Sequence, residues 1–179
     1  MFGYVNSFLL VPGTDVNTGP IVPEQQKCLE NSTHCFPGAL CWPETSDIMK
    51  FGDSLDGHLL LPQDELYRNL TVMKNVRVTK YPAMIAVIKS TLDVQKSIQW
   101  ARSRSIQIVV QSSGHDFQGR STADGALMIY LGNMTDIKIN LNSKRSDCPY
   151  GEITLDSGNQ WQRVYKEVHR LYAFGINIK

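Results

Sequence analysis

The sequence predicts an α+β fold that is built on a β-α-β unit and continues into further strands and a helix. Three observations support this prediction: an apolar run over residues 83–88, a helical pattern that begins at Ser90, and an apolar run over residues 108–110. A strand, a helix and a strand in direct succession imply parallel strands joined by a right-handed crossover. Small and polar residues follow the second run, at the carboxyl end of a strand, where α/β sheets bind their ligands.

The chain before this unit predicts little regular structure. We interpret residues 1–77 as a lead-in and residues 78–179 as a domain. Apolar side chains recur at helical spacing in the lead-in and predict one short helix over residues 44–55. Residues 63–80 are interpreted as a loose polar connection, because no apolar period runs through them.

The helix of the β-α-β unit has a clear beginning and a predicted buried face. Ser90 is a typical N-cap residue, and Asp93 lies in the first turn, where a negative charge suits the helix dipole. Val94, Ile98 and Ala101 fall at i, i+4 and i+7, which predicts that this apolar face packs on the sheet. The β-branched residues 108–110 that follow predict a strand buried on both faces.

The last third of the chain predicts three more strands and one strongly amphipathic helix. The strands are expected at residues 127–131, 137–141 and 152–156, with a polar turn over residues 142–151. The helix opens near residue 161 and stops at Gly175. Its apolar positions, of which Trp161 and Tyr165 are expected to pack in the core, are Trp161, Val164, Tyr165, Val168, Leu171 and Tyr172.

Residues 112–121 are the part of the sequence with the strongest functional signal. Ser112, Ser113 and Gly114 allow backbone N–H groups to approach a ligand, and Gly114 can adopt positive φ at little cost. Successive N–H groups in such a turn form an anion-binding concavity. Neither of the two common phosphate-binding patterns, G-x-x-x-x-G-K-[ST] and G-x-G-x-x-G, occurs in the chain. The alternative is a plain turn in which His115 is incidental.

Cysteines and glycosylation sequons favour a secreted protein. The cysteines are Cys28, Cys35, Cys41 and Cys148, and the sequons stand at Asn31, Asn69 and Asn133. The first three cysteines and His34 could hold zinc, but C-x-x-C pairs are absent, so a disulfide-stapled turn is favoured. A cytosolic protein with free thiols is the alternative, and the first residues do not decide it, because they lack a basic start and a clear cleavage site.

Composition excludes several classes of function. The 179 residues carry a net charge of +1, which gives no indication of binding to nucleic acid or to an anionic membrane surface. The chain has no apolar run long enough to span a bilayer. Its hydrophobic fraction of 42% is that of a globular protein.

Four segments together resemble the FAD-linked oxidases of the vanillyl-alcohol-oxidase type, in particular the berberine-bridge-enzyme-like branch. These proteins carry a PCMH-type FAD-binding domain. The loop residues Gly114-His115-Asp116-Phe117 with Gly119 match the first pyrophosphate loop of this family, although Ser113 stands where the family often has Gly or Thr. The other segments that resemble it are Cys35-Phe-Pro-Gly with Cys41-Trp-Pro, Asp93-Val-Gln with Trp100-Ala-Arg, and Trp161-Gln-Arg-Val-Tyr165.

The resemblance implies that FAD is the cofactor and that the loop binds its pyrophosphate. The residues implied are Ser112, Ser113, Gly114, His115, Asp116, Gly119 and Ser121. The family histidine is often bonded to the 8α-methyl group of the flavin, which implies a covalent role for His115. The family passes a hydride from a small organic substrate to FAD, and oxygen commonly reoxidises the flavin.

The resemblance also implies that much of such an oxidase is outside this chain. In the family, a second glycine-rich flavin-binding segment follows, and then a substrate domain that carries the catalytic base. We therefore expect a fragment, and we assign no catalytic base and no metal ligand in it. The alternatives are a secreted module that kept the fold without the chemistry, and a small disulfide-rich extracellular binding protein.

Overall fold

The computed structural model describes residues 33–72, 75–141 and 151–173, and for residues 171–173 it describes the backbone alone. All of these residues lie in one compact unit. Several predictions fall outside the described residues. These concern Cys28, Asn31, the polar turn over residues 142–150, Cys148, the side chains of Leu171 and Tyr172, and the helix stop at Gly175.

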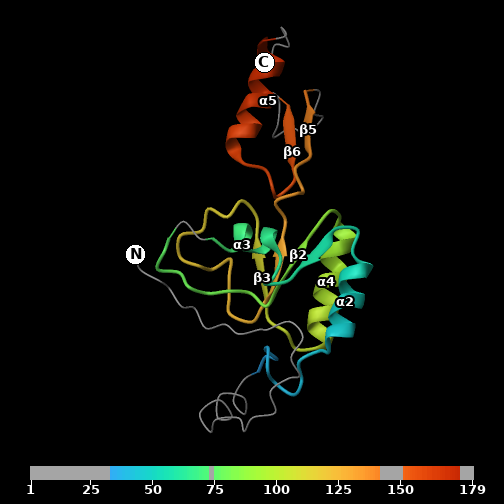
Figure 1. Ribbon diagram of the computed structural model, residues 1–179. Helices are drawn as coiled ribbons and strands as arrows, with labels where there is room; N and C mark the ends of the chain where they lie inside the picture. Colours follow the sequence, from blue (N-terminus) through green and yellow to red (C-terminus); the bar gives the residue numbers. More distant parts are fainter. Residues whose placement is uncertain (1–32, 73–74, 142–150, 174–179) are drawn as a thin grey trace. The chain divides into compact units, whose positions relative to one another are not determined.

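A four-stranded mixed sheet forms the centre of the unit (Figure 1). Its order is β1 (His58–Leu60), β2 (Met84–Val87), β4 (Leu127–Tyr130) and β3 (Ile108–Gln111). β2, β4 and β3 are parallel, and β1 pairs with β2 in the antiparallel direction. The predicted β-α-β unit and its parallel strands are confirmed, but β4 lies between the two strands of that unit.

Helices cover both faces of this sheet. These helices are α2 (Thr45–Ser54), α3 (Glu65–Thr71) and α4 (Thr91–Ser103); a further helix, α5 (Trp161–Ala173), follows the two-stranded sheet in the chain. Because side chains alternate along a strand, Met84 and Ala86 pack in one core with residues of α2 and α4. Ile85 and Val87 pack in a second core that includes Tyr67 of α3.

Two predictions about burial are wrong. β3 is an edge strand, and its Val110 side chain is 50% exposed, so the doubly buried strand is β2 instead. On α4 the expected Ala101 is buried and Val94 packs against the core, but Ile98 is 45% exposed, and Asp93 and Ser97 are buried beside Ala101 instead. The carboxylate of Asp93 binds backbone N–H groups of the protein, and these bonds hold the side of the helix that carries Asp93 against the core.

Asp93 joins the beginning of α4 to the turn before β1. Its carboxylate accepts hydrogen bonds from the backbone N–H groups of Asp56 (2.8 Å), Gly57 (3.1 Å) and Lys89 (3.0 Å). Ser90 caps the same helix end, as predicted, and accepts from the Asp93 N–H group at 3.2 Å. Burial raises the pKa of Asp93, but the three N–H groups and the Lys96 ammonium group outweigh it, so the pKa lies below its usual value.

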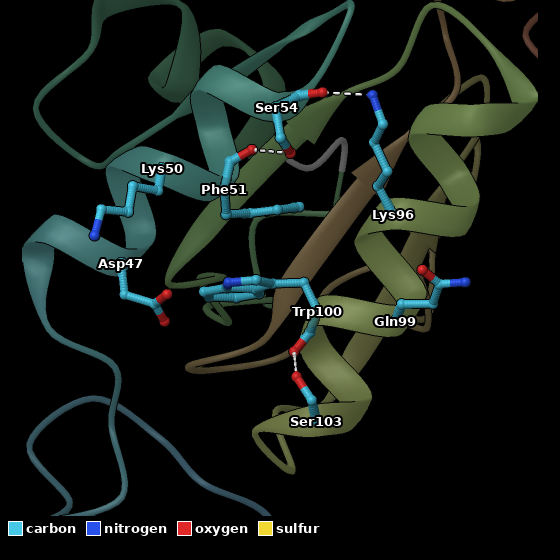
Figure 2. Close-up of a pocket in the computed structure, with 8 residues that line it drawn as sticks. All are labelled: Asp47, Lys50, Phe51, Ser54, Lys96, Gln99, Trp100 and Ser103. Atoms are coloured by element: carbon cyan, nitrogen blue, oxygen red, sulfur yellow. Dashed lines mark hydrogen bonds between the residues drawn. The ribbon is translucent and has the colours of Figure 1, made fainter.

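Aromatic and charged side chains hold α2 against α4. The rings of Phe51 and Trp100 are stacked, with centroids 4.4 Å apart, as Figure 2 shows between the two helices. The Arg104 guanidinium lies 4.7 Å from the centre of the Trp100 ring and binds both carboxylate oxygens of Asp47, at 2.6 and 2.8 Å. Such a bidentate ion pair fixes the angle between its partners better than a single contact.

A two-stranded sheet and α5 make up the last part of the described chain. β5 (Ile137–Asn140) pairs with β6 (Glu152–Leu155) in the antiparallel direction. The predicted α5 is confirmed, but the core positions of Trp161 and Tyr165 are wrong. These side chains are 65% and 66% exposed, and they stack on each other with centroids 5.7 Å apart. Val164 is the buried residue of this helix turn.

The start of the described chain confirms the stapled turn. Cys35 and Cys41 form a disulfide, and Cys35 is buried in the core with α2 and α4. Within the described ranges, no cluster of His, Cys, Asp or Glu residues could hold a metal ion. Over the same ranges, no helix is long and apolar enough to cross a membrane.

Two elements of the lead-in were not predicted. β1 has three residues, and α3 occupies residues that we interpreted as a polar connection, with Tyr67 buried at its centre. The Tyr67 hydroxyl donates to the carbonyl of Pro82 at 2.6 Å. Burial is the main cause that raises the pKa of Tyr67 to about 12, so this group stays a neutral donor.

Candidate functional site

The loop over residues 112–121 leaves the carboxyl end of β3. Because β3 and β4 are parallel neighbours, this loop lies at the edge of the sheet where both strands end. Gly114 and Gly119 both have a φ of +71°, the left-handed region that L side chains rarely adopt. The loop therefore needs glycine at two positions, as the sequence predicted for Gly114.

Asp116 organises the second half of the loop. Its carboxylate accepts hydrogen bonds from the backbone N–H groups of Gln118 (3.0 Å), Ser121 (3.0 Å) and Arg120. The Arg120 guanidinium also lies 3.5 Å from this carboxylate. The Gln118 N–H group is the largest cause that lowers the pKa of Asp116, and with the other two N–H groups and the guanidinium it brings that pKa to about 2 against a smaller opposing effect of burial.

The first half of the loop keeps its backbone donors free. The N–H groups of Ser113, Gly114 and His115 have no acceptor within the described part of the chain. A run of free N–H groups around a glycine with positive φ forms a concavity that favours anions. N–H donors in such a row suit an anionic group, whereas the Asp116 carboxylate binds the amides of the second half of the loop.

His115 lies at the surface of this concavity. Its ring is exposed, and Nδ1 is 3.1 Å from the Ser113 hydroxyl. The Phe117 side chain is also exposed. The histidine is thus free to meet a ligand that sits on the loop, while the serine restricts the orientation of the imidazole ring.

Ser112 joins the loop to the segment before α5. Its hydroxyl donates to the backbone carbonyl of Ser157. Gly158 donates its N–H group to the carbonyl of Met134 at 2.9 Å, which lies in the turn after β4. Hydrogen bonds therefore connect the end of β3, the turn after β4 and the residues that lead into α5.

The loop is held by contacts with residues 75–80, which we had interpreted as part of a loose connection. Asn75 donates from Nδ2 to the carbonyl of Phe117 at 2.8 Å. Val78 packs so closely against Gly119 that an added Cβ atom would lie 2.7 Å from its Cγ1. The Thr122 hydroxyl donates to the carbonyl of Lys80 at 3.1 Å. No signal in the sequence separates Asn75 and Val78 from other loop residues, because their contacts lie about forty positions away.

All residues that we expected to bind a cofactor lie in this one loop, but they have different structural roles in it. Three of them present the free N–H groups, and Gly119 and Ser121 belong to the half that Asp116 holds. Direct contact of each residue with FAD stays a prediction. The residues are Ser112, Ser113, Gly114, His115, Asp116, Gly119 and Ser121.

A groove elsewhere on the unit contributes nothing to this site. It measures about 440 Å³ and lies between α2 and α4, lined by Lys50, Lys96, Trp100 and their neighbours (Figure 2). None of its lining residues comes from the loop. Its floor is the stacked pair of Phe51 and Trp100, so we interpret it as the seam between two packed helices.

Comparisons with known proteins agree with the chemistry of the loop. A model of the FAD binding domain matches residues 82–178, which is more than half of the chain. An uncharacterized FAD-linked oxidoreductase of Arthroderma benhamiae is 33% identical over 92 residues, which are 49% of this chain and 16% of that protein. The (R)-6-hydroxynicotine oxidase of Paenarthrobacter nicotinovorans is 30% identical over 103 residues, or 58% of this chain and 22% of that one.

Solved structures show the same fold. The VAO-type flavoprotein MtVAO713 from Myceliophthora thermophila C1 has a TM-score of 0.56 and 20% identity, over 74% of this chain and 33% of that one. BBE-like #28 from Arabidopsis thaliana has a TM-score of 0.56 and 19% identity, over 70% and 25%. The chain spans less than a third of the length of the curated relatives named above.

Proposed function

We propose that this chain, which belongs to the FAD binding domain family, is the flavin-binding part of an FAD-linked oxidase. FAD is its cofactor, and the row of free N–H groups at Ser113, Gly114 and His115 is the observation that carries the proposal. FAD supplies the redox chemistry when bound, as acceptor of a hydride from a carbon atom of a small organic substrate, with oxygen as the final acceptor.

The task of the chain itself is to bind and orient the pyrophosphate. Three N–H donors in one turn stabilise the two negative charges of a pyrophosphate. Asp116 keeps the opposite side of the loop folded, and Asn75 holds it in place. Among the described residues we assign no catalytic base.

FAD binding by the chain tests the proposal directly. We expect FAD to bind and its fluorescence to change, and Gly114→Val to abolish binding because a β-branched residue is strained at positive φ. Gly38→Val is the matched control, since Gly38 has a φ of +89° and nothing lies within 4 Å of an added Cβ. Failure of the wild-type chain to bind FAD, or equal loss in both variants, would contradict the proposal.

Oxygen consumption separates an oxidase from the alternative of a non-catalytic module. The measurement needs a longer protein that contains this chain, together with a panel of small organic substrates. We expect substrate-dependent bleaching of the flavin under nitrogen and oxygen uptake in air. Bound flavin that no substrate bleaches would favour the non-catalytic module.

We also propose that His115 carries the flavin covalently. The support is its exposed position beside the free N–H groups and the resemblance of the loop to the family motif. Acid-precipitated protein should then retain the yellow colour, and His115→Ala should release it into the supernatant. A colourless wild-type pellet would exclude the covalent bond and leave FAD binding intact.

Secretion with glycosylation is a further part of the proposal. The Cys35–Cys41 disulfide supports it, and the side chains of Asn69 and Asn133 are exposed. Protein made in a eukaryotic secretory host should lose mass on glycosidase treatment, and Asn69→Gln with Asn133→Gln should remove most of that change. An unchanged mass together with four alkylatable thiols would place the protein in a reducing compartment.

A further inference from the structure

Gln111 is the residue at the base of the loop, and its side chain is an unusual buried amide. It is the last residue of β3 and is 6% exposed. Its Nε2 donates to the carbonyl of Leu70 at 3.3 Å, in the last turn of α3. Its Oε1 is buried and has no hydrogen-bond partner among the described residues.

The orientation of this amide serves α3 and the loop. Exchange of the two ends of the amide would place Oε1 against the Leu70 carbonyl, where two acceptors would face each other. The amide is therefore fixed by its bond to α3, although this orientation leaves Oε1 unpaired. A buried acceptor without a donor opposes folding, so a residue of this kind calls for an explanation other than stability.

The Gln111 amide also lies against the Gly114 turn, which holds the free N–H donors. A Cβ atom added to Gly114 would lie 3.2 Å from Gln111 Nε2 and 3.9 Å from its Cδ. The Gly114 turn thus rests on the Gln111 amide, which in turn is held by α3. The Gln111 amide therefore links the turn that holds the three free N–H groups to α3.

We propose that Gln111 is a positioning residue for the cofactor loop, which fixes the Gly114 turn to α3 so that the N–H groups of Ser113, Gly114 and His115 stay aligned on the FAD pyrophosphate. The inference rests on the proposed function and deepens it. It assigns to α3 a part in cofactor binding through the Leu70 carbonyl. Residues 65–71, which touch no free donor of the loop, would thus act on the site through Gln111.

Gln111→Met is the variant that tests the inference, because it keeps the length of the side chain and removes both polar ends. We expect the full chain to bind FAD, and ADP as a flavin-free pyrophosphate probe, about tenfold more weakly, as for one lost aligning hydrogen bond. The melting temperature without ligand should stay the same or rise, because the unpaired acceptor is gone. Gln95→Met, the same change at an exposed position of α4, should alter neither quantity.

A cycle with Gly114→Ala sharpens the test. The added methyl group meets Gln111 Nε2, so the effects of Gly114→Ala and Gln111→Met on affinity should not add. Hydrogen exchange at residues 113–115, measured without ligand, should be faster in Gln111→Met than in the wild type. This last measurement stands even if the wild-type chain binds neither FAD nor ADP, an outcome that would contradict the proposed function alone.

Two results would overturn the inference. One is wild-type FAD affinity and unchanged loop exchange in folded Gln111→Met. The other is a fall in affinity that is matched by a fall in melting temperature without ligand, since that pattern belongs to a residue of the core rather than to one that aligns the loop.

Discussion

At the scale of single residues, the Asp116 carboxylate occupies the N–H groups of Gln118, Arg120 and Ser121, so these groups are not available to a phosphate. A negative charge beside an anion site repels the ligand in proportion to how close it lies. Here three backbone N–H groups and the exposed Arg120 guanidinium, 3.5 Å away, offset part of that charge. We infer that the carboxylate shapes the loop and that the ligand meets the other side of it.

Asp116→Asn should therefore weaken FAD binding even though it removes a negative charge. The amide keeps one acceptor oxygen and loses the other, so the three N–H groups compete for it. Isothermal titration with FAD measures the effect, and Asp124→Asn, an exposed aspartate outside the loop, is the control. Tighter binding in Asp116→Asn would mean that charge repulsion outweighs the order of the loop.

The low pKa of Asp116 also predicts the pH dependence of the loop. The pKa of Asp116 in the fold is about 2, below its usual value of 3.8, so the fold favours the charged form. The stabilisation is then present above about pH 4 and is lost as the pH falls toward 2. The protection factors of the Gln118 and Ser121 amides, which correct for the intrinsic pH dependence of hydrogen exchange, should fall over this window in the wild type and change less in Asp116→Asn.

At the scale of elements, Asp93 joins α4 to the turn before β1 through three backbone N–H groups. We expect Asp93→Ala to lower the free energy of unfolding by about 2–4 kcal/mol, because three backbone N–H groups, two of them in the turn before β1, lose their charged acceptor. Urea denaturation at pH 7 measures this, with the exposed Asp53→Ala as the matched control. Since the pKa of Asp93 is lowered in the fold, the difference from wild type should shrink as the pH falls below about 4.

The sequence predicted the elements that have a strong period and failed where a contact decided the outcome. β2, β4 and α4 have clear apolar runs or a capped start, and they lie within a residue or two of their expected bounds. The apolar pattern predicted Val94, Ile98 and Ala101 on the buried face of α4. Val94 and Ala101 do face the core, but Asp93 and Ser97 are buried in place of Ile98, and the carboxylate of Asp93 is hydrogen-bonded there. α3 is too short to show a period, and only two of its residues, Tyr67 and Thr71, are buried.

The position of the loop could be predicted, but the separate roles of its residues could not. Glycine, serine and histidine after a strand mark the place where a ligand binds, and all the expected residues lie there. The supports at Asn75, Val78 and Gln111 are distant in sequence or belong to a strand end, and nothing about their residue types reveals them.

At the scale of the whole described unit, the apolar surface of α5 is unevenly covered. Val164 is buried, whereas Trp161 and Tyr165 form an exposed stacked pair. Exposed rings of this size add little to the stability of the chain that carries them, because little apolar area leaves the water. They favour association with other apolar surfaces.

Trp161→Gln with Tyr165→Lys should therefore leave the melting temperature of the chain nearly unchanged and raise its solubility. Val164→Ala is the contrasting variant and should destabilise the fold by about 1–2 kcal/mol, because it opens a cavity in a buried site. Thermal melts and ultracentrifugation of the three proteins measure both effects. A large loss of stability in the double variant would show that the two rings pack in solution.

The order of the strands has a consequence for how the chain folds during synthesis. β2, α4 and β3 leave the ribosome first, but β2 and β3 pair with β4 and not with each other. β1 precedes β2 in the chain and can pair with it, but until residues 127–130 emerge the other edge of β2 and the edge of β3 that faces β4 have unsatisfied backbone groups, a state that is open to aggregation. Nascent chains stalled so that β3 has left the exit tunnel but β4 has not, compared with chains in which β4 has also emerged, should show protease sensitivity that disappears once the central strand has closed the sheet.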